Sequence, residues 1–315
     1  MQNWQKKSDK IRADYLAAKK ANPDKFEATL NLSWSNWGFG MEPLATSVKR
    51  LADSGVKFIE LHGNRYGQDL GYEASEVARI LEDQGVKVGG ICGMFSAECD
   101  LSSNSGVTRQ RAIDYIRRNV DLGREFDAKY FLIVPGAVGR PAAIDNMEFD
   151  RSVETLAIVA DVFTQAGIRG AVEPIRSAET SIVHTFADAE RYIKQLDHPG
   201  VQHINGDVYH MLVEESHIQQ TLVDYGPRLT NLHLADTNRC ALGDGSLDID
   251  TLMMALYLIG YNNEWCYCTP EPLGSGGDPY PAMHGKPDPR LLDDLVRNSA
   301  RCWREREAVV RDLTE

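Results

Sequence analysis

Short apolar runs rich in β-branched residues alternate with longer amphipathic stretches along most of the chain. Short apolar runs are typical of buried strands, and apolar positions that recur three and four residues apart are typical of helices. The runs predict eight strands: Glu27–Ser33, Lys57–Leu61, Lys87–Cys92, Tyr130–Val134, Ile168–Glu173, Val201–Asp207, Thr230–Leu234 and Glu264–Thr269. The amphipathic stretches predict eight helices: Pro43–Ser54, Ala74–Gln84, Arg109–Phe126, Phe149–Gln165, Thr185–Leu196, His217–Tyr225, Ile249–Ile259 and Pro289–Val309.

This alternation predicts the α/β class and, within it, a (β/α)8 TIM barrel with an N-terminal helical extension. Each intervening helix lets two successive strands pair in parallel, and closing the sheet is the simplest arrangement of eight such units. A doubly wound open sheet is the alternative that the pattern leaves open. No Pro- or Ser-rich linker divides the chain, so we expect residues 1–315 to form a single domain, with residues 1–25 as the helical extension.

The composition is that of an ordinary globular protein, and the net charge makes some classes of binding partner less favourable. Hydrophobic residues make up 43% of the chain and charged residues 25%. A net charge of −12 argues against binding to nucleic acid or to anionic membranes. No stretch approaches the roughly 18 apolar residues of a membrane span, and the charged N-terminus lacks the apolar core of a signal peptide, so we expect a cytoplasmic protein. The six scattered cysteines are expected to be free thiols.

Potential metal ligands follow four consecutive predicted strands. The fifth strand ends in Glu173 and the sixth in Asp207, the seventh contains His233, and the eighth runs into Glu271. Active sites of TIM barrels lie at the carboxyl ends of the strands, so these side chains would surround one point. Any one of them could instead be a helix cap, an ion-pair partner or a packed histidine. Together they predict one divalent cation, because three carboxylates and an imidazole suit Mn²⁺, Mg²⁺ or Co²⁺ better than a thiolate-rich zinc site.

Two polar residues on the loops beyond these strands are candidates for contacts with a substrate. His210 follows Asp207 by three residues, and Arg239 follows His233 by six. Both could hold a hydroxyl or carbonyl oxygen. His210 could also be a packed loop residue, and Arg239 a surface arginine.

Aromatic residues near the first and third strands give a further clue to the substrate. Trp34 is predicted to contact it, and other aromatic residues lie nearby on these two loops: Trp37, Phe39 and Phe95. They could line a pocket for a bulky apolar group, or they could pack beneath the loops.

Two glutamates beside a cation indicate a specific kind of chemistry. A proton on a carbon next to a ketone is a weak acid, and a divalent cation favours its loss by stabilising the negative charge that develops on oxygen. A carboxylate on one face can remove the proton, and a second on the other face can return one. Glu173 and Glu271 are the candidates for this pair. The sequence leaves open which of them acts first as the base.

Three segments of the chain resemble the xylose-isomerase-like superfamily. They are Val172–Pro174, Gly206–Met211 and His233–Arg239, and they look closest to the D-tagatose (psicose) 3-epimerase and keto-glycoside epimerase branch. The resemblance implies that Glu173, Asp207, His233 and Glu271 bind Mn²⁺ or a similar ion and that the two glutamates exchange the substrate proton. It also implies that His210 and Arg239 hold substrate oxygens. The expected function is epimerisation or isomerisation of a keto-sugar or 3-keto-glycoside.

Two features depart from the simple epimerases and keep another function open. The chain has the N-terminal extension, and a Gly- and Pro-rich loop from Gly274 to Pro287 follows Glu271. In these features it is similar to the catalytic subunits of C-glycoside deglycosidases, which would cleave a 3-keto-C-glycoside by eliminating the aglycone, as a carbon–carbon lyase. We therefore expect a small carbohydrate or glycoside as substrate, and we leave open a homo-oligomer or a small partner subunit. A DNA-repair enzyme similar to endonuclease IV is disfavoured by the acidic chain and its eight histidines.

Overall fold

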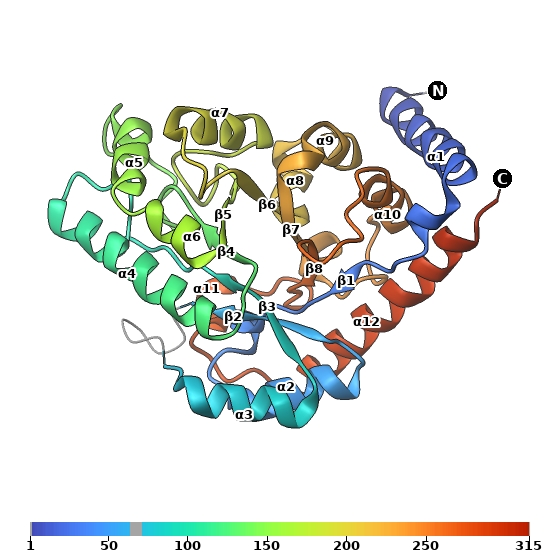
Figure 1. Ribbon diagram of the computed structural model, residues 1–315, viewed down its shortest axis with the longest axis horizontal. Helices are drawn as coiled ribbons and strands as arrows, with labels where there is room; N and C mark the ends of the chain where they lie inside the picture. The colour runs from blue at the N-terminus through green and yellow to red at the C-terminus, as the bar shows by residue number, and fades with distance from the viewer. Residues whose placement is uncertain (1, 64–70, 315) are drawn as a thin grey trace.

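Parallel strands form a nearly closed barrel at the centre of the molecule (Figure 1). The computed structural model describes residues 2–63 and 71–314, and within them the strands follow the order β1-β8-β7-β6-β5-β4-β3-β2. Their bounds are β1 Asn31–Leu32, β2 Phe58–His62, β3 Lys87–Cys92, β4 Tyr130–Ile133, β5 Arg169–Val172, β6 His203–Asp207, β7 Leu229–Leu234 and β8 Tyr267–Pro270. A parallel bridge between Ser35 and Glu60 joins β1 to β2. The predicted (β/α)8 barrel is confirmed.

Helices surround the barrel and bury its outer face (Figure 1). They are α1 Asn3–Ala21, α2 Leu44–Asp53, α3 Ala74–Gln84, α4 Gly106–Glu125, α5 Glu148–Ala157, α6 Asp161–Ala166, α7 Phe186–Leu196, α8 Val208–Glu214, α9 Ile218–Tyr225, α10 Ile249–Leu258, α11 Pro279–Ala282 and α12 Pro289–Asp312. The N-terminal helix α1 packs against α9 and α10. Lys19 on α1 donates hydrogen bonds to the carbonyls of Arg311 and Leu313 at the end of α12, which ties the two ends of the chain together.

Two predicted elements differ from the structure, each because of where its backbone hydrogen bonds go. The strand expected at Glu27–Ser33 is only two residues long, because the Leu30 amide donates to the Glu307 carboxylate instead of to a neighbouring strand (2.7 Å). The helix expected at Phe149–Gln165 is divided into α5 and α6. Between them the amide of Val159 bonds to the carbonyl three residues earlier, which interrupts the α-helical pattern.

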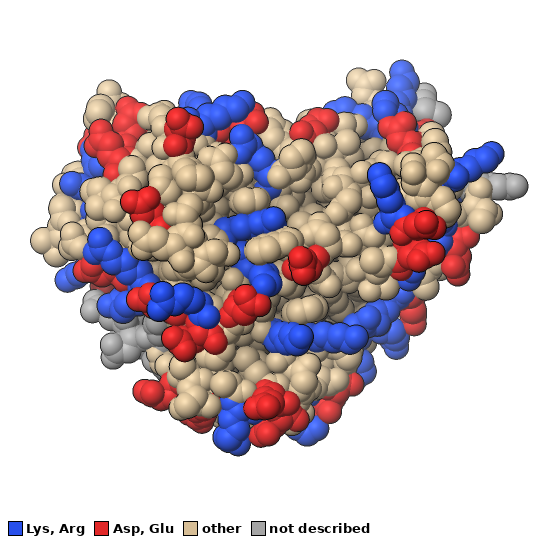
Figure 2. All heavy atoms as spheres, viewed as in Figure 1, with Lys and Arg blue, Asp and Glu red and all other residues tan. Residues whose placement is uncertain are grey.

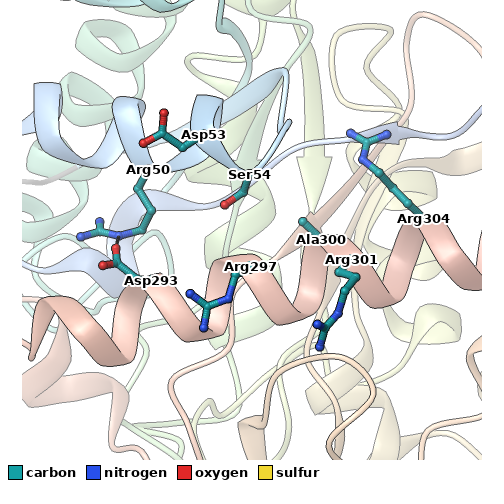
Figure 3. A pocket seen from close by; sticks show the side chains of 8 residues that line it. All are labelled: Arg50, Asp53, Ser54, Asp293, Arg297, Ala300, Arg301 and Arg304. Atoms are coloured by element: carbon teal, nitrogen blue, oxygen red, sulfur yellow. Dashed lines mark hydrogen bonds and ion pairs between the residues drawn. The ribbon is translucent and has the colours of Figure 1, made fainter.

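The last helix closes the ring of helices by packing against the first helix of the barrel proper (Figure 3). Arg50 on α2 donates to Asp293 on α12 (2.6 Å) and to Glu42 (2.7 Å). Arg304 on α12 donates to the Gly55 carbonyl after α2 (2.6 Å). These contacts bridge a groove of about 400 Å³ between the two helices.

The surface seen in Figure 2 carries acidic and basic side chains interspersed with each other, with no single field of one sign. Within residues 2–63 and 71–314, the structure has no helix that is both long and apolar enough to span a bilayer.

His203 at the start of β6 makes the stability of the fold depend on pH. Burial, together with the positive charges of Arg169 and Arg228, lowers the pKa of His203 to about 4. The unfolded chain therefore binds a proton at His203 between about pH 6.5 and 4 that the folded chain does not bind. His203 does not lower the free energy of unfolding above this pH window. As the pH drops through the window, this one side chain lowers the free energy of unfolding by at most about 1.4 kcal/mol per pH unit.

We expect His203→Gln to lose less stability than the wild type when the pH is lowered from 7 to 5, because the variant cannot take up this proton. Urea unfolding at a series of pH values measures the difference. Parallel loss of stability in the two proteins would contradict the prediction.

Candidate active site at the carboxyl ends of the strands

The four predicted metal ligands lie together at the carboxyl ends of consecutive strands. Glu173 directly follows β5, Asp207 ends β6, His233 lies near the end of β7, and Glu271 directly follows β8. None of the four is more than 5% exposed. The Nδ1 atom of His233 lies 3.5 Å from Glu173 Oε1 and 3.2 Å from Glu271 Oε2. Donor atoms of Glu173, Asp207 and His233 all lie within 4.8 Å of one another. The structure thus brings Glu173, Asp207 and His233 to one point, with Glu271 beside them in contact with His233.

A fifth acidic residue, Glu60, lies on the far side of the His233 ring. The two carboxylate oxygens of Glu60 are 2.9 and 3.0 Å from His233 Nε2. Burial alone would raise the pKa of Glu60, but the charge and hydrogen bond of His233 and the hydroxyls of Ser35 and Tyr130 hold it below its usual value. Glu60 is not among the site residues predicted from the sequence. The sequence feature that could have identified it is its position inside the apolar run of β2. A carboxylate in such a run is expected to be buried and therefore to need a partner.

The carboxylates of the cluster are crowded in a place from which water is largely excluded. Burial raises the pKa of Glu271 to about 8, with repulsion from Asp207 adding to the effect and His233 opposing it. Burial likewise raises the pKa of Glu173. The indole N–H of Trp37 donates to Glu271 Oε2 (2.6 Å) and stabilises its charged form. Because burial disfavours the charged forms of these carboxylates, the cluster favours the binding of a cation that would compensate their charge.

The donor set fits one divalent cation. Carboxylate oxygens and an imidazole nitrogen suit Mn²⁺, Mg²⁺ or Co²⁺. The Nδ1 of His233 is directed at the carboxylates of Glu173 and Glu271. A cation bound there would offset the repulsion of these two carboxylates by Asp207. Glu173, Asp207, His233 and Glu271 could therefore hold the ion.

The two predicted substrate contacts adjoin this cluster and have unused hydrogen-bonding capacity. His210 Nε2 lies 3.2 Å from Asp207 Oδ2, while its Nδ1 has no hydrogen-bond partner among the described residues. Arg239 is 4% exposed, its Nη1 lies 3.8 Å from Glu271 Oε1, and its Nε and Nη1 have no hydrogen-bond partner within the same part of the chain. Its guanidinium stacks 3.9 Å from the ring of Tyr209. Buried donors without partners are costly unless a ligand satisfies them.

A cavity of about 360 Å³ opens above the cluster, and Trp37 rather than Trp34 lines it. Trp34 is 1% exposed and stacks on Phe39, with ring centroids 6.1 Å apart. The reason is the alternation of side chains along a strand. Ser35 pairs with Glu60 in a parallel bridge, so the two side chains share the interior face, and Trp34 before Ser35 points outward. The structure does not bring Trp34 to the cavity, contrary to the expectation that it contacts substrate.

The long loop after Glu271 covers one side of the cavity. It contains α11, and four of its residues line the cavity: Pro279, Tyr280, Met283 and His284. The Met41 amide donates to the Gly285 carbonyl (3.0 Å) beside the loop after β1. Gly40 has a φ of 57°, and a Cβ there would lie 2.4 Å from that carbonyl, so only glycine permits this approach.

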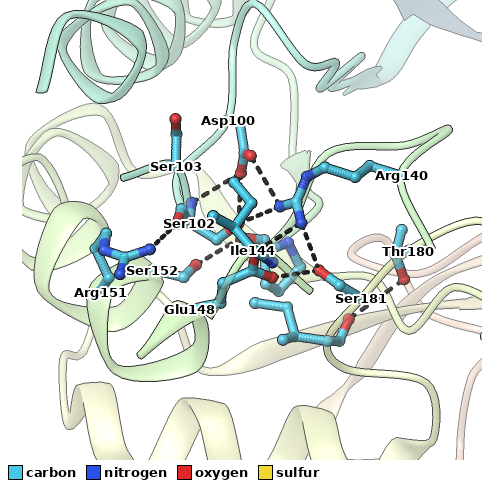
Figure 4. A network of polar contacts seen from close by, with 12 residues as sticks. Asp100, Ser102, Ser103, Arg140, Ile144, Glu148, Arg151, Ser152, Thr180 and Ser181 are labelled. Carbon is cyan, nitrogen blue, oxygen red and sulfur yellow. Dashed lines mark hydrogen bonds and ion pairs between the residues drawn. The ribbon is translucent and has the colours of Figure 1, made fainter. Parts of the chain in front are cut away.

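A network of charged groups ties together loops that flank the cavity (Figure 4). Arg140, on the loop after β4, donates to Asp100 on the loop after β3 (3.0 Å) and to Glu148 at the start of α5 (2.6 Å). The Gly139 amide then donates to the Glu179 carbonyl (2.9 Å), and Glu179 itself lines the cavity. Arg140 also donates to Ser181 Oγ on the loop after β5 (3.2 Å), so one arginine links the three loops that follow β3, β4 and β5.

Comparison with known proteins agrees with this architecture. A ketose 3-epimerase from Arthrobacter globiformis is 26% identical over 228 residues, which cover 71% of this chain and 76% of that protein. A 3-dehydro-D-guloside 4-epimerase from Escherichia coli K12 is 26% identical over 250 residues, covering 76% and 91%. A solved L-ribulose 3-epimerase shares the fold with a TM-score of 0.78 at 18% identity, covering 90% of this chain and 96% of that one. The xylose isomerase-like TIM barrel family matches residues 48–288, and the chain belongs to this family.

Proposed function

We propose that the protein is an epimerase that moves a proton at the carbon next to the carbonyl of a keto-sugar or 3-keto-glycoside. The observation that carries the proposal is the position of Glu173 and Glu271, whose carboxylates approach the same nitrogen of His233 from β5 and β8. The relatives that act on ketoses and on a 3-dehydro-glycoside support a small carbohydrate as the substrate.

The two glutamates act as a pair of proton carriers. One carboxylate removes the proton from the carbon, and the other returns a proton to the opposite face, so that the configuration of that carbon is inverted. Because the reaction is reversible, each glutamate serves as the base for one of the two epimers. Trp37 orients Glu271 by donating its indole N–H.

A divalent cation, Mn²⁺ in our proposal and otherwise Mg²⁺ or Co²⁺, would be held by Glu173, Asp207, His233 and Glu271 and would stabilise the charge that develops on the carbonyl oxygen. His210 and Arg239 bind and orient the sugar oxygens. Their unpartnered nitrogens beside Asp207 and Glu271 support this assignment.

One observation favours a second candidate, elimination of an aglycone from a 3-keto-C-glycoside. Apolar side chains line much of the cavity: Met94, Phe95, Val138, Ile175 and Met283. Such a wall suits an apolar substituent more than the hydroxyls of a free ketose. Proton removal by a glutamate would be followed by departure of the aglycone instead of reprotonation.

We expect the purified protein to bind one divalent cation per chain. Exhaustive chelation should abolish exchange of solvent protons into the substrate, and added Mn²⁺ should restore it. Elemental analysis before and after chelation gives the stoichiometry. Three zinc ions per chain, or full activity of the metal-free protein, would refute this assignment.

The carboxylates and the two oxygen-binding residues should respond differently to mutation. Glu173→Gln or Glu271→Gln should lower proton exchange by about 10²- to 10⁴-fold, because each removes a proton carrier. Arg239→Ala should instead cost about 1.5–3 kcal/mol in substrate binding, since a charge-assisted hydrogen bond is lost. His210→Ala should likewise weaken chiefly substrate binding, and both alanine variants should retain the metal. Near-normal exchange by Glu271→Gln would exclude the two-carboxylate mechanism.

The choice between the two reactions is tested by offering both kinds of substrate. We expect free ketohexoses or a 3-keto-glucoside to be epimerised, with deuterium from solvent at the inverted carbon. A 3-keto-C-glucoside of a flavonoid is the competing substrate, assayed by release of the aglycone. Release without epimerisation would replace the first candidate with the second.

A further inference from the structure

A layer of fully buried polar side chains lies inside the barrel beneath the proposed metal site. It consists of Glu60 on β2, Tyr130 on β4, Asn205 on β6 and Asn231 on β7, and each is 0% exposed. Polar groups at such positions are costly unless they are fully hydrogen-bonded. The bonds that they make lead directly to two of the four proposed ligands.

We infer that Glu60 is a positioning residue that orients His233 for metal binding, an inference that rests on the proposed function. A neutral imidazole has one N–H and one lone pair. Because a carboxylate accepts hydrogen bonds, the two contacts of Glu60 with Nε2 keep a proton on that nitrogen. Nδ1 is then the nitrogen left to bind a cation held beside Glu173 and Glu271.

Glu60 is itself held in place from two sides. The Tyr130 hydroxyl donates to Glu60 Oε2 (2.8 Å), and the Asn231 amide donates to the same oxygen (3.2 Å). The carboxylate therefore cannot rotate without breaking bonds to β4 and β7. This arrangement fixes the plane of the carboxylate against the edge of the His233 ring.

The same layer reaches a second proposed ligand through the two asparagines. Asn231 donates to Asn205 Oδ1 (2.7 Å), and Asn205 donates to Glu173 Oε1 (3.1 Å). Thr269 on β8 donates to Asn231 Oδ1 (2.7 Å), which fixes the orientation of its amide. The layer thus positions the imidazole and one oxygen of Glu173 together.

Another role for Glu60 would be to bind a second cation. Glu60, Cys92 and His233 have donor atoms within 4.8 Å of one another. This group would need the Nε2 of His233 as a ligand, but that atom faces both oxygens of Glu60 at hydrogen-bond distance. The geometry therefore assigns Glu60 to holding the histidine.

The test is the affinity of the metal-free protein for Co²⁺ alone, measured by calorimetry. Glu60→Gln keeps the shape but offers only one acceptor oxygen, and its amide can donate to Nε2 and move the imidazole proton to Nδ1. We expect the Kd for Co²⁺ to rise about 10- to 100-fold, the usual effect of losing such a partner. Glu307→Gln is the matched control, because Glu307 is also buried and accepts from a tyrosine hydroxyl, that of Tyr257 (2.8 Å). Its Kd should equal that of the wild type.

A measurement on the wild type keeps the inference testable if Glu60→Gln does not fold. In ¹⁵N-histidine-labelled protein loaded with ¹¹³Cd²⁺, we expect cadmium coupling at Nδ1 of His233 and a retained proton at Nε2. The His233→Gln spectrum assigns the signal. Coupling at Nε2, or two bound ions per chain, would overturn the inference.

The outcomes separate this inference from the proposed function. If the wild type binds no Co²⁺, the metal site itself is refuted. If the wild type binds Co²⁺ and Glu60→Gln binds it equally well, only the role of Glu60 is refuted. Equal weakening in Glu60→Gln and Glu307→Gln would also refute it, because the effect would then follow from losing any buried carboxylate.

Discussion

The burial of several carboxylates at one end of the barrel is the constraint on which the rest of the site depends. Glu173, Asp207 and Glu271 are each at most 5% exposed, and Glu60 beneath them is fully buried. An anion removed from water is stable only when it is paired with a cation or with hydrogen-bond donors. The donors found around these groups, and the cation that we propose, meet this requirement. The same crowding keeps the two proposed proton carriers beside a single point.

The parallel barrel provides this arrangement because each strand contributes side chains to the interior at alternate positions. His233 and Asn231 lie two residues apart on β7, so one reaches the cavity and the other the polar layer below it. Asp207 and Asn205 are related in the same way on β6. Two successive layers of the interior are therefore built from the same strands, the upper one with candidate metal ligands and the lower one with groups that orient them.

The loops around the site are tied to one another by ion pairs and hydrogen bonds. On one side, Arg140 links the loops after β3 and β4 through ion pairs with Asp100 and Glu148. It reaches the loop after β5 through a hydrogen bond to Ser181. On the other, the loop with α11 is tied across the cavity, since the Tyr280 hydroxyl donates to Glu179 (3.4 Å). Glu179 also pairs with Arg176 at 2.5 Å. The cavity between these walls combines a charged floor with apolar sides, a chemistry suited to a polar sugar that carries an apolar group.

The sequence by itself determined the barrel and the convergence of Glu173, Asp207, His233 and Glu271. Alternating strands and helices leave few topologies, and parallel strands all end at the same edge. Only the tertiary structure decided the partner of His233, because Glu60 is 173 positions away along the chain and across the barrel. It likewise decided that Trp37, not Trp34, faces the cavity, because Trp37 lies on a short 3-10 helix, Asn36–Phe39, that follows β1. Contacts across the barrel depend on packing, and so does the face of a strand to which each side chain points. The local sequence pattern therefore does not predict them.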